Sequence, residues 1–219
     1  MNLLIAGATG LIGGLALRHA LAEPRVTAVT CIGRRTLPLT DPKLTQVTAD
    51  FARLDDSAAG ITAIDAALCG LGTTIRQAGS RQAFHAVDHD AVLAFARLAK
   101  AKGARRFAVV SSVGASSRSG TFYLATKGRM EDGLEKIGFE RLAILQPSFL
   151  LGERTKKRPG EGYATAFAQL IAPLLLGDWH RYRPIDADAV ARALLQAVLA
   201  DPAPAERLTY DGILALARR

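Results

Sequence analysis

Tyr123 and Lys127 stand four residues apart in the stretch GTFYLATKGRMED, which runs from Gly120 to Asp132. If this stretch is helical, the two side chains share one face, with Cβ atoms about 5–6 Å apart. A nearby ammonium favours the phenolate form of a tyrosine, so the pair could pass a proton to or from a reacting oxygen atom. The same spacing also arises by chance, and the elements around the pair must decide between the two interpretations.

A glycine-rich turn near the start of the sequence supplies a second chemical signal. In LLIAGATGLIGG, Gly7, Gly10 and Gly13 stand between an apolar run of strand length and the start of a helical pattern. Glycine suits a tight turn and lets the backbone approach a pyrophosphate, which then faces the N–H groups and the positive dipole end of the following helix. The turn predicts dinucleotide binding by Gly7, Thr9, Gly10, Leu11, Ile12 and Gly13.

The second predicted strand ends in TCIGRR, with Arg34 and Arg35 about twenty residues beyond the glycines. An NAD-binding fold places an acidic residue there for the ribose hydroxyls, whereas a guanidinium forms charge-assisted hydrogen bonds with a 2′-phosphate. The arginine pair therefore favours NADP, bound as NADPH, over NAD. The alternative is a pair of solvated loop arginines.

The ends of three later predicted strands carry further candidates for cofactor contacts. These strands end in VTADF, CGLGTT and LQPSF. Because parallel strands bring their carboxyl ends to one edge, VTADF could reach the adenine, the backbone of CGLGTT could come close to the cofactor, and LQPSF could border the nicotinamide. Each stretch also has a plainer interpretation as a turn, and the proline as the end of a strand. The candidates are Asp50, Phe51, Leu71, Gly72, Thr73, Pro147, Ser148 and Phe149.

Apolar runs of strand length alternate with helical patterns along most of the chain. Strands are expected in NLLIAG, RVTAVTCIG, LTQVTAD, AIDAALCGLG, RRFAVVSS and ERLAILQP, and helices over 11–22, 80–102, 121–137, 163–176 and 187–200, with a short strand and helix at the end. Such alternation predicts a parallel sheet with helices on both faces. We therefore expect one α/β domain over residues 1–219, a doubly wound parallel sheet (Rossmann fold) in which residues 148–219 form a small substrate-side extension.

The composition is that of a globular protein and narrows the choice of partners. Hydrophobic residues make up 49% of the 219 residues, and no run reaches the roughly twenty apolar residues of a membrane span. The net charge is +8, but the basic residues are scattered without interleaved aromatics, which argues against a nucleic-acid partner. The apolar N-terminus lacks a basic leader, so we expect a cytoplasmic protein with no membrane partner and with Cys31 and Cys69 as reduced core thiols. A homodimer is left open.

Several motifs in order along the chain resemble the atypical short-chain dehydrogenases/reductases, in particular the Tat-interacting oxidoreductase-like group and its bacterial relatives. They are the glycine turn, CGLGTT, VVSSVGA, YLATKG and QPSFLLGERTKKRPGE, and the resemblance covers residues 1 to about 200. The chain departs from the family pattern by an extra glycine in CGLGTT and by a glycine after Glu161. The resemblance implies an NADPH-binding Rossmann fold with Ser111, Tyr123 and Lys127 as the reductase triad. Neighbouring strand residues point to opposite sides, and the family spacing to the tyrosine selects Ser111 over Ser112.

Two functions from different classes follow from these features. The first is an NADPH-dependent reductase of a small carbonyl compound, in which Tyr123 protonates the oxygen, Ser111 hydrogen-bonds it and Lys127 also holds the nicotinamide ribose. The alternative is a redox-sensing regulator that binds NADPH without rapid turnover. The intact tyrosine and lysine favour the enzyme, since a pure sensor needs no proton donor.

Two other groups of residues give weaker signals. Tyr163, Phe167 and Trp179 could line a substrate pocket, but such aromatics also fit a hydrophobic core. His85 and His89 lie four apart in FHAVDHD, as metal ligands could, but the glutamate of an H-E-x-x-H motif is absent. The sequence therefore predicts a solvated helix surface there and no metal.

Overall fold

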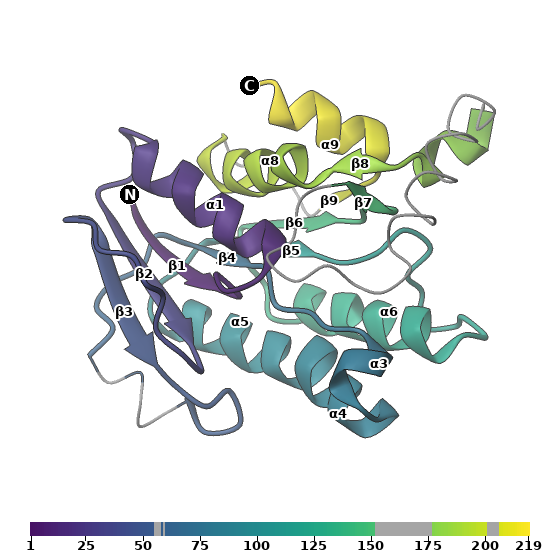
Figure 1. The fold of residues 1–219 in the computed structure, drawn as a ribbon, viewed down its shortest axis with the longest axis horizontal. Coiled ribbons are helices and arrows are strands. Elements are labelled where there is room, and N and C mark those ends of the chain that lie inside the picture. The colour runs from purple at the N-terminus through teal and green to yellow at the C-terminus, as the bar shows by residue number, and fades with distance from the viewer. Residues whose placement is uncertain (55–57, 59, 152–176, 201–205) are drawn as a thin grey trace.

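The structure is a computed structural model, and it describes residues 1–54, 58, 60–151, 177–200 and 206–219. Parallel strands form one sheet in the order β3-β2-β1-β4-β5-β6-β9 (Figure 1). Its strands are β1 (Asn2–Ala6), β2 (Ala28–Gly33), β3 (Leu44–Thr48), β4 (Ala66–Cys69), β5 (Arg106–Val110), β6 (Arg141–Leu145) and β9 (Glu206–Leu208). A separate small sheet pairs β7 (Leu150–Leu151) with β8 (Ile185–Asp186).

Helices connect these strands and cover both faces of the sheet. They are α1 (Leu11–Ala22), α3 (Ile75–Ala78), α4 (Arg81–His85), α5 (Ala91–Ala101), α6 (Phe122–Glu135), α8 (Ala187–Leu199) and α9 (Tyr210–Ala217), with a π turn (Ala86–Asp90) between α4 and α5 and a 3-10 helix (Gly177–Tyr182) before β8. Figure 1 shows α1, α8 and α9 on one face and α5 and α6 on the other. The predicted doubly wound α/β fold is confirmed.

The order of the strands reverses beside β1. This strand pairs with β2 on one side and with β4 on the other, both in parallel. Successive strands first step outward from β1 to β3, and the chain then returns to the centre and steps outward in the opposite direction. In open α/β sheets, ligands bind outside the carboxyl ends of the strands at such a point.

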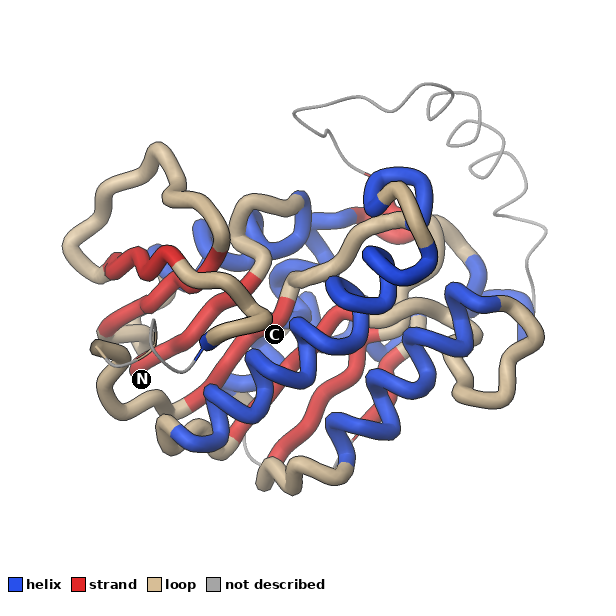
Figure 2. The backbone as a smooth tube through the Cα atoms, turned by 90° about the horizontal axis from the view of Figure 1, so that it is seen from below, coloured by secondary structure: helices blue, strands red, loops and turns tan. Residues whose placement is uncertain are grey.

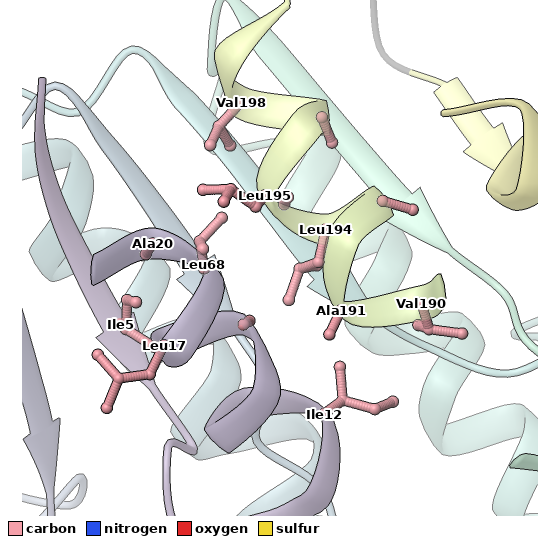
Figure 3. Close-up of a cluster of buried hydrophobic side chains, with 14 of the residues drawn as sticks. Ile5, Ile12, Leu17, Ala20, Leu68, Val190, Ala191, Leu194, Leu195 and Val198 are labelled. Atoms are coloured by element: carbon pink, nitrogen blue, oxygen red, sulfur yellow. The ribbon is translucent and has the colours of Figure 1, made fainter. Parts of the chain in front are cut away.

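Alternate residues of β1 supply the two hydrophobic cores. Leu3 and Ile5 pack into the core beneath α1 and α8, whereas Leu4 and Ala6 pack into the core beneath α5 and α6. Successive strand side chains point to opposite faces, so a strand covered on both sides must be apolar throughout. Figure 3 shows the first core, where Leu17 and Ala20 of α1 and Leu194 of α8 lie among its labelled side chains.

The C-terminal segment does more than cover one edge of the sheet. β9 adds a strand beside β6, and α8 packs on the sheet with most of its residues buried. The burial of α8 against α1 is a large part of the first core, so this helix contributes to the stability of the domain. The predicted helix over 163–176, with Tyr163 and Phe167, and the RPGE stretch at 158–161 lie outside the described residues.

The long helix predicted over 80–102 is present but contains an irregular turn. Ser80 caps it as expected, since its Oγ accepts a hydrogen bond from the Ala83 N–H at 3.0 Å. Gly103 follows its end with a φ of +98°, as expected of a C-terminal glycine. The π turn between α4 and α5 was not predicted, and it decides where the side chains of residues 85–90 point. Figure 2, seen from below, shows the helices of this side lying over the strands.

Both cysteines are free and buried in the cores, as predicted. Burial raises the pKa of each thiol to about 12, so both stay protonated at neutral pH. Among the described residues, no helix is both long and apolar enough to cross a membrane.

Candidate functional site

Two glycines of the N-terminal turn are required by packing alone. Gly7 has a φ of +84°, and a Cβ atom there would lie 2.4 Å from the carbonyl carbon of Gly70, just after β4. A Cβ atom on Gly13 would lie 2.2 Å from the carbonyl oxygen of Gly7. Since neither position can hold a side chain, these glycines let β1, α1 and the end of β4 come together.

Gly10 is different, because its packing is much less restrictive. Its backbone is extended, with φ −88° and ψ 171°, and a Cβ atom would approach the Gly7 carbonyl oxygen only to 3.2 Å. Gly10 is the N-cap of α1 and offers no side chain to its first turn, which holds no acidic residue. The N–H groups of that turn lack partners inside the helix and can accept an anion. The turn therefore fits a dinucleotide pyrophosphate, and Gly10 keeps the approach to it open.

This difference gives a prediction for two matched glycine substitutions. We expect Gly10→Ala to fold with a melting temperature close to that of the wild type, but to bind NADPH about 100-fold more weakly. Gly13→Ala should instead prevent folding, because its methyl group meets a backbone oxygen that cannot move aside. Circular dichroism and fluorescence titration with NADPH check both results. Unchanged NADPH affinity in folded Gly10→Ala would contradict the assignment of this turn.

The end of β4 joins the glycine turn to a buried ion pair. Lys127 Nζ lies 2.7 Å from Asp88 Oδ1, and the two side chains are 4% and 0% exposed. The other carboxylate oxygen of Asp88 accepts a hydrogen bond from the Thr73 N–H at 2.8 Å. A Cβ atom on Gly72 would lie 3.7 Å from Lys127 Nζ, so this backbone lies against the lysine. The structure thus brings the predicted Gly72, Thr73 and Lys127 together.

The charge state of Lys127 follows from this pair. Burial lowers the pKa of the ammonium, but the nearby Asp88 carboxylate and the Tyr123 oxygen more than offset that effect. The net result is a pKa above the ordinary value for lysine. Lys127 is therefore a fixed positive charge at neutral pH.

Tyr123 lies in the first turn of α6, four residues before Lys127. The helix begins at Phe122 because the Thr121 side chain caps it, accepting from the Leu124 N–H at 3.4 Å. The ring of Tyr123 is half-buried and packs against Phe84, with ring centroids 5.4 Å apart. This aromatic contact fixes the direction of the ring, and the predicted helix at the YLATKG motif is confirmed.

The predicted Ser111 makes a contact that the sequence did not indicate. It follows β5, is buried, and donates its hydroxyl hydrogen to Glu131 Oε1. Glu131 also accepts from Gln146 Nε2 at 2.9 and 3.0 Å and from Arg207 Nε at 2.9 Å. The neighbouring Ser112 is only half-buried. The catalytic role of Ser111 stays a prediction, with Ser112 as the competing candidate.

The remaining predicted cofactor residues lie at the carboxyl ends of their strands, as expected. Arg34 and Arg35 are exposed just after β2. After β3, Asp50 is exposed and Phe51 packs against the second core, as does Leu71 after β4. After β6, Pro147 is buried, and Ser148 donates its hydroxyl hydrogen to the Arg183 carbonyl, while Phe149 is 67% exposed.

Asp88 and Glu131 are two buried acidic residues that sequence reasoning missed. Both left a signal in the helical periodicity. Asp88 lies four residues after Phe84 and four before Val92, both fully buried, so an acid interrupts an apolar face. Glu131 continues the spacing of the Tyr123 and Lys127 pair by four more residues. An ionisable residue at a core position of a helix is a sign of a buried partner.

The chain matches a known protein family over most of its length. The family model described as NAD(P)H-binding matches residues 7–201. Rat protein HTATIP2 is 39% identical over 169 residues, which are 76% of this chain and 69% of that protein. The mitochondrial protein fmp52 of Emericella nidulans is 32% identical over 219 residues, covering 95% of this chain and 94% of that protein.

Solved structures show a likeness in fold alone. The UDP-glucose 4-epimerase of Thermotoga maritima, in complex with UDP-glucose, aligns with a TM-score of 0.71 at 14% sequence identity. The alignment covers 100% of this chain and 82% of the epimerase.

Proposed function

Because the chain belongs to the NAD(P)H-binding family, among the atypical short-chain dehydrogenases/reductases of the HTATIP2 group, we propose that it is an NADPH-dependent reductase of a small carbonyl compound. The proposal concerns the substrate class, the choice of NADPH and the proton donor. The fungal relative is named as a mitochondrial protein, so a cytoplasmic location for this chain stays a prediction. A homodimer also stays a prediction.

The observation that carries the proposal is a continuous series of contacts at the carboxyl edge of the sheet. Gly7 touches the backbone of Gly70, and the same loop continues to Gly72, which lies against Lys127. A dinucleotide with its pyrophosphate on the turn before α1 would extend along this edge toward α6. Its nicotinamide end would then lie near Tyr123 and Lys127.

The residues of α6 can supply the proton and the positive charge that a carbonyl reduction needs. NADPH, when bound, supplies the hydride that a carbonyl carbon accepts. Tyr123 would donate its hydroxyl proton to the carbonyl oxygen as negative charge develops there. Lys127 stabilises the resulting phenolate by its fixed positive charge. A serine hydroxyl at the end of β5 would donate a hydrogen bond to the same oxygen and orient the substrate.

The direct test follows NADPH absorbance at 340 nm with the purified chain and a panel of aldehydes, ketones and quinones. We expect turnover of at least one compound, with one NADPH oxidised per carbonyl reduced. Saturable NADPH binding without turnover of any compound would reject the reductase and favour the regulator. Absence of NADPH binding would reject both functions.

One observation favours the regulator as the second candidate. Asp88 neutralises Lys127 at 2.7 Å, so Tyr123 faces a compensated ion pair rather than an isolated ammonium. This arrangement weakens the stabilisation of a phenolate. A protein that only senses NADPH would tolerate it.

Substitution can distinguish the roles of the two serines after β5, Ser111 and Ser112. We expect Ser112→Ala to lower kcat about 10- to 100-fold at unchanged thermal stability if its half-buried hydroxyl is the one that meets the substrate, since the Ser111 hydroxyl is bound to Glu131. Ser111→Ala should lower stability by about 1–3 kcal/mol, since the buried Glu131 carboxylate loses a donor, and should spare kcat. Steady-state kinetics and urea unfolding give both values. The reverse pattern would identify Ser111, the serine predicted from the sequence, as the catalytic one.

The choice between NADPH and NADH depends on the arginine pair after β2. We expect the Arg34→Ala, Arg35→Ala double variant to raise KM for NADPH about 10- to 100-fold, through the loss of charge-assisted hydrogen bonds to the 2′-phosphate. KM for NADH should change less than about threefold, because NADH lacks that phosphate. Arg218→Ala, Arg219→Ala serves as the control with the same change in charge. Equal effects on both cofactors would show that the pair does not recognise the 2′-phosphate.

A further inference from the structure

The π turn carries a group of metal-binding side chain types that the reductase proposal does not use. His85 ends α4, while His89 and Asp90 lie in the turn. His85 Nδ1 is 3.1 Å from Asp90 Oδ2, and His89 Nδ1 is 2.7 Å from Asp90 Oδ1. The two imidazole rings lie with centroids 4.4 Å apart. Two imidazoles thus point a nitrogen atom at one carboxylate.

This grouping depends on the irregular turn. In an α-helix, a residue five positions along lies about 140° around the axis, so His85 and Asp90 would diverge. A π turn bonds residue i to residue i+5, which returns the fifth residue to the side of the first. The five residues Ala86–Asp90 form such a turn. Regular α-helical spacing over this stretch would therefore keep Asp90 away from His85.

The separation of the donor atoms suits one small cation. One ligand atom from each of His85, His89 and Asp90 can be chosen so that all three lie within 4.8 Å of one another. Two nitrogen atoms bound to one zinc ion at about 2.0–2.1 Å can be at most about 4.2 Å apart. The side chains are 33%, 20% and 60% exposed, so small rotations can close the difference.

We propose that His85, His89 and Asp90 bind a divalent transition-metal ion of the zinc type through two imidazole nitrogens and one carboxylate oxygen. Water fills the remaining coordination positions, since the site is open to solvent. Imidazole and carboxylate donors together suit Zn²⁺, Ni²⁺ and Cu²⁺ better than Mg²⁺ or Ca²⁺.

The site is also placed to act on the reductase machinery. Asp88, between the two histidines in sequence, points inward from the same turn and holds Lys127. An ion on the outer side would fix the conformation of the turn that positions Asp88. The metal site and the reductase are nevertheless tested separately, because metal binding can be measured without NADPH.

The test is calorimetric titration of the metal-free full chain with ZnCl₂ at neutral pH. We expect one saturable site in the wild type. In His85→Gln and in His89→Gln, the affinity for Zn²⁺ should fall by about 100-fold or more. His180→Gln is the matched control, because His180 forms a similar pair with Asp211 at 2.9 Å but belongs to no group of three ligands among the described residues. It should bind Zn²⁺ like the wild type. Zn²⁺ should also raise the melting temperature of the wild type and of His180→Gln, but not that of His85→Gln or His89→Gln.

A second metal reports the ligand atoms. Cu²⁺ bound at one equivalent should show an electron paramagnetic resonance spectrum with splitting from two imidazole nitrogens, reduced to one in either histidine variant. Zn²⁺ binding of equal affinity in the wild type and the His85→Gln, His89→Gln double variant would overturn the proposal. So would the absence of saturable binding in the folded wild type.

Discussion

Tyr123→Phe is expected to lower kcat about 10²- to 10⁴-fold, because it removes the proposed proton donor and changes little else. The phenylalanine ring keeps the packing against Phe84, whose centroid lies 5.4 Å from that of the tyrosine. The melting temperature and the dissociation constant for NADPH should therefore stay close to those of the wild type. Steady-state kinetics on the best substrate of the carbonyl panel gives kcat, fluorescence titration gives the dissociation constant for NADPH, and thermal unfolding followed by circular dichroism gives the melting temperature.

A matched control for this substitution is available in the same chain. Tyr210→Phe removes the same hydroxyl group from the start of α9, where Tyr210 packs against His180 rather than near Lys127. It should leave kcat unchanged. Full reductase activity in Tyr123→Phe would contradict the proposed mechanism. Equal losses of kcat in Tyr123→Phe and Tyr210→Phe would show that the effect is not specific to the proposed proton donor.

Asp88→Leu is expected to destabilise the fold by about 3–5 kcal/mol, which is the effect of removing one partner of a buried ion pair. Lys127 is only 4% exposed and would keep its charge without a counterion, and the Thr73 N–H would lose its acceptor. Asp88→Asn should be less damaging, because its amide oxygen can still accept from Thr73. Asp132→Asn, on the half-exposed side of α6, is the control and should change stability by less than about 0.5 kcal/mol.

The dependence of this effect on pH follows from the pKa of Lys127. In the wild type the pKa of Lys127 lies above its unfolded value of about 10.4. The stabilisation from the ion pair is therefore complete at pH values below about 10.4 and is lost as the pH rises through the folded pKa. In Asp88→Leu the main opposing influence, the Asp88 carboxylate, is gone, so burial lowers the pKa. The buried ammonium then opposes folding at neutral pH, and this penalty shrinks as the pH rises through the lowered folded pKa.

The difference in unfolding free energy between wild type and Asp88→Leu should therefore narrow between pH 7 and pH 10. Urea unfolding at several pH values measures it. A difference that stays constant over this range would show that Lys127 does not need its carboxylate partner.

The fold could be predicted from local features of the sequence. The helix α1 begins and ends where the apolar pattern after the glycine turn predicts, and Ser80, Thr121 and Gly103 mark helix ends by their own chemistry. Continuous apolar runs such as NLLIA identify strands covered on both faces. The place of β9 beside β6 could not be predicted, because a strand of three residues has almost no pattern of its own.

The candidate site was predictable only in part. The glycine turn and the pair of Tyr123 and Lys127 can both be recognised in the sequence, since the function of each depends on residues that are close together along the chain. The partners of Asp88 and Glu131 could not be predicted, because Lys127 and Arg207 are distant from them along the chain. The hydroxyl of Ser111 was assigned from spacing, whereas its direction depends on where β5 lies relative to α6.

The sequence by itself determined a parallel α/β sheet with a dinucleotide turn and the residue types for proton transfer, because periodicity, turn chemistry and helix spacing are local properties. The tertiary structure decided which of those residues meet. It placed a carboxylate against Lys127, bound Ser111 to Glu131 and used a π turn to bring His85, His89 and Asp90 together. These contacts depend on how helices and strands pack and on one irregular hydrogen-bonding turn, which no pattern with a fixed period can show.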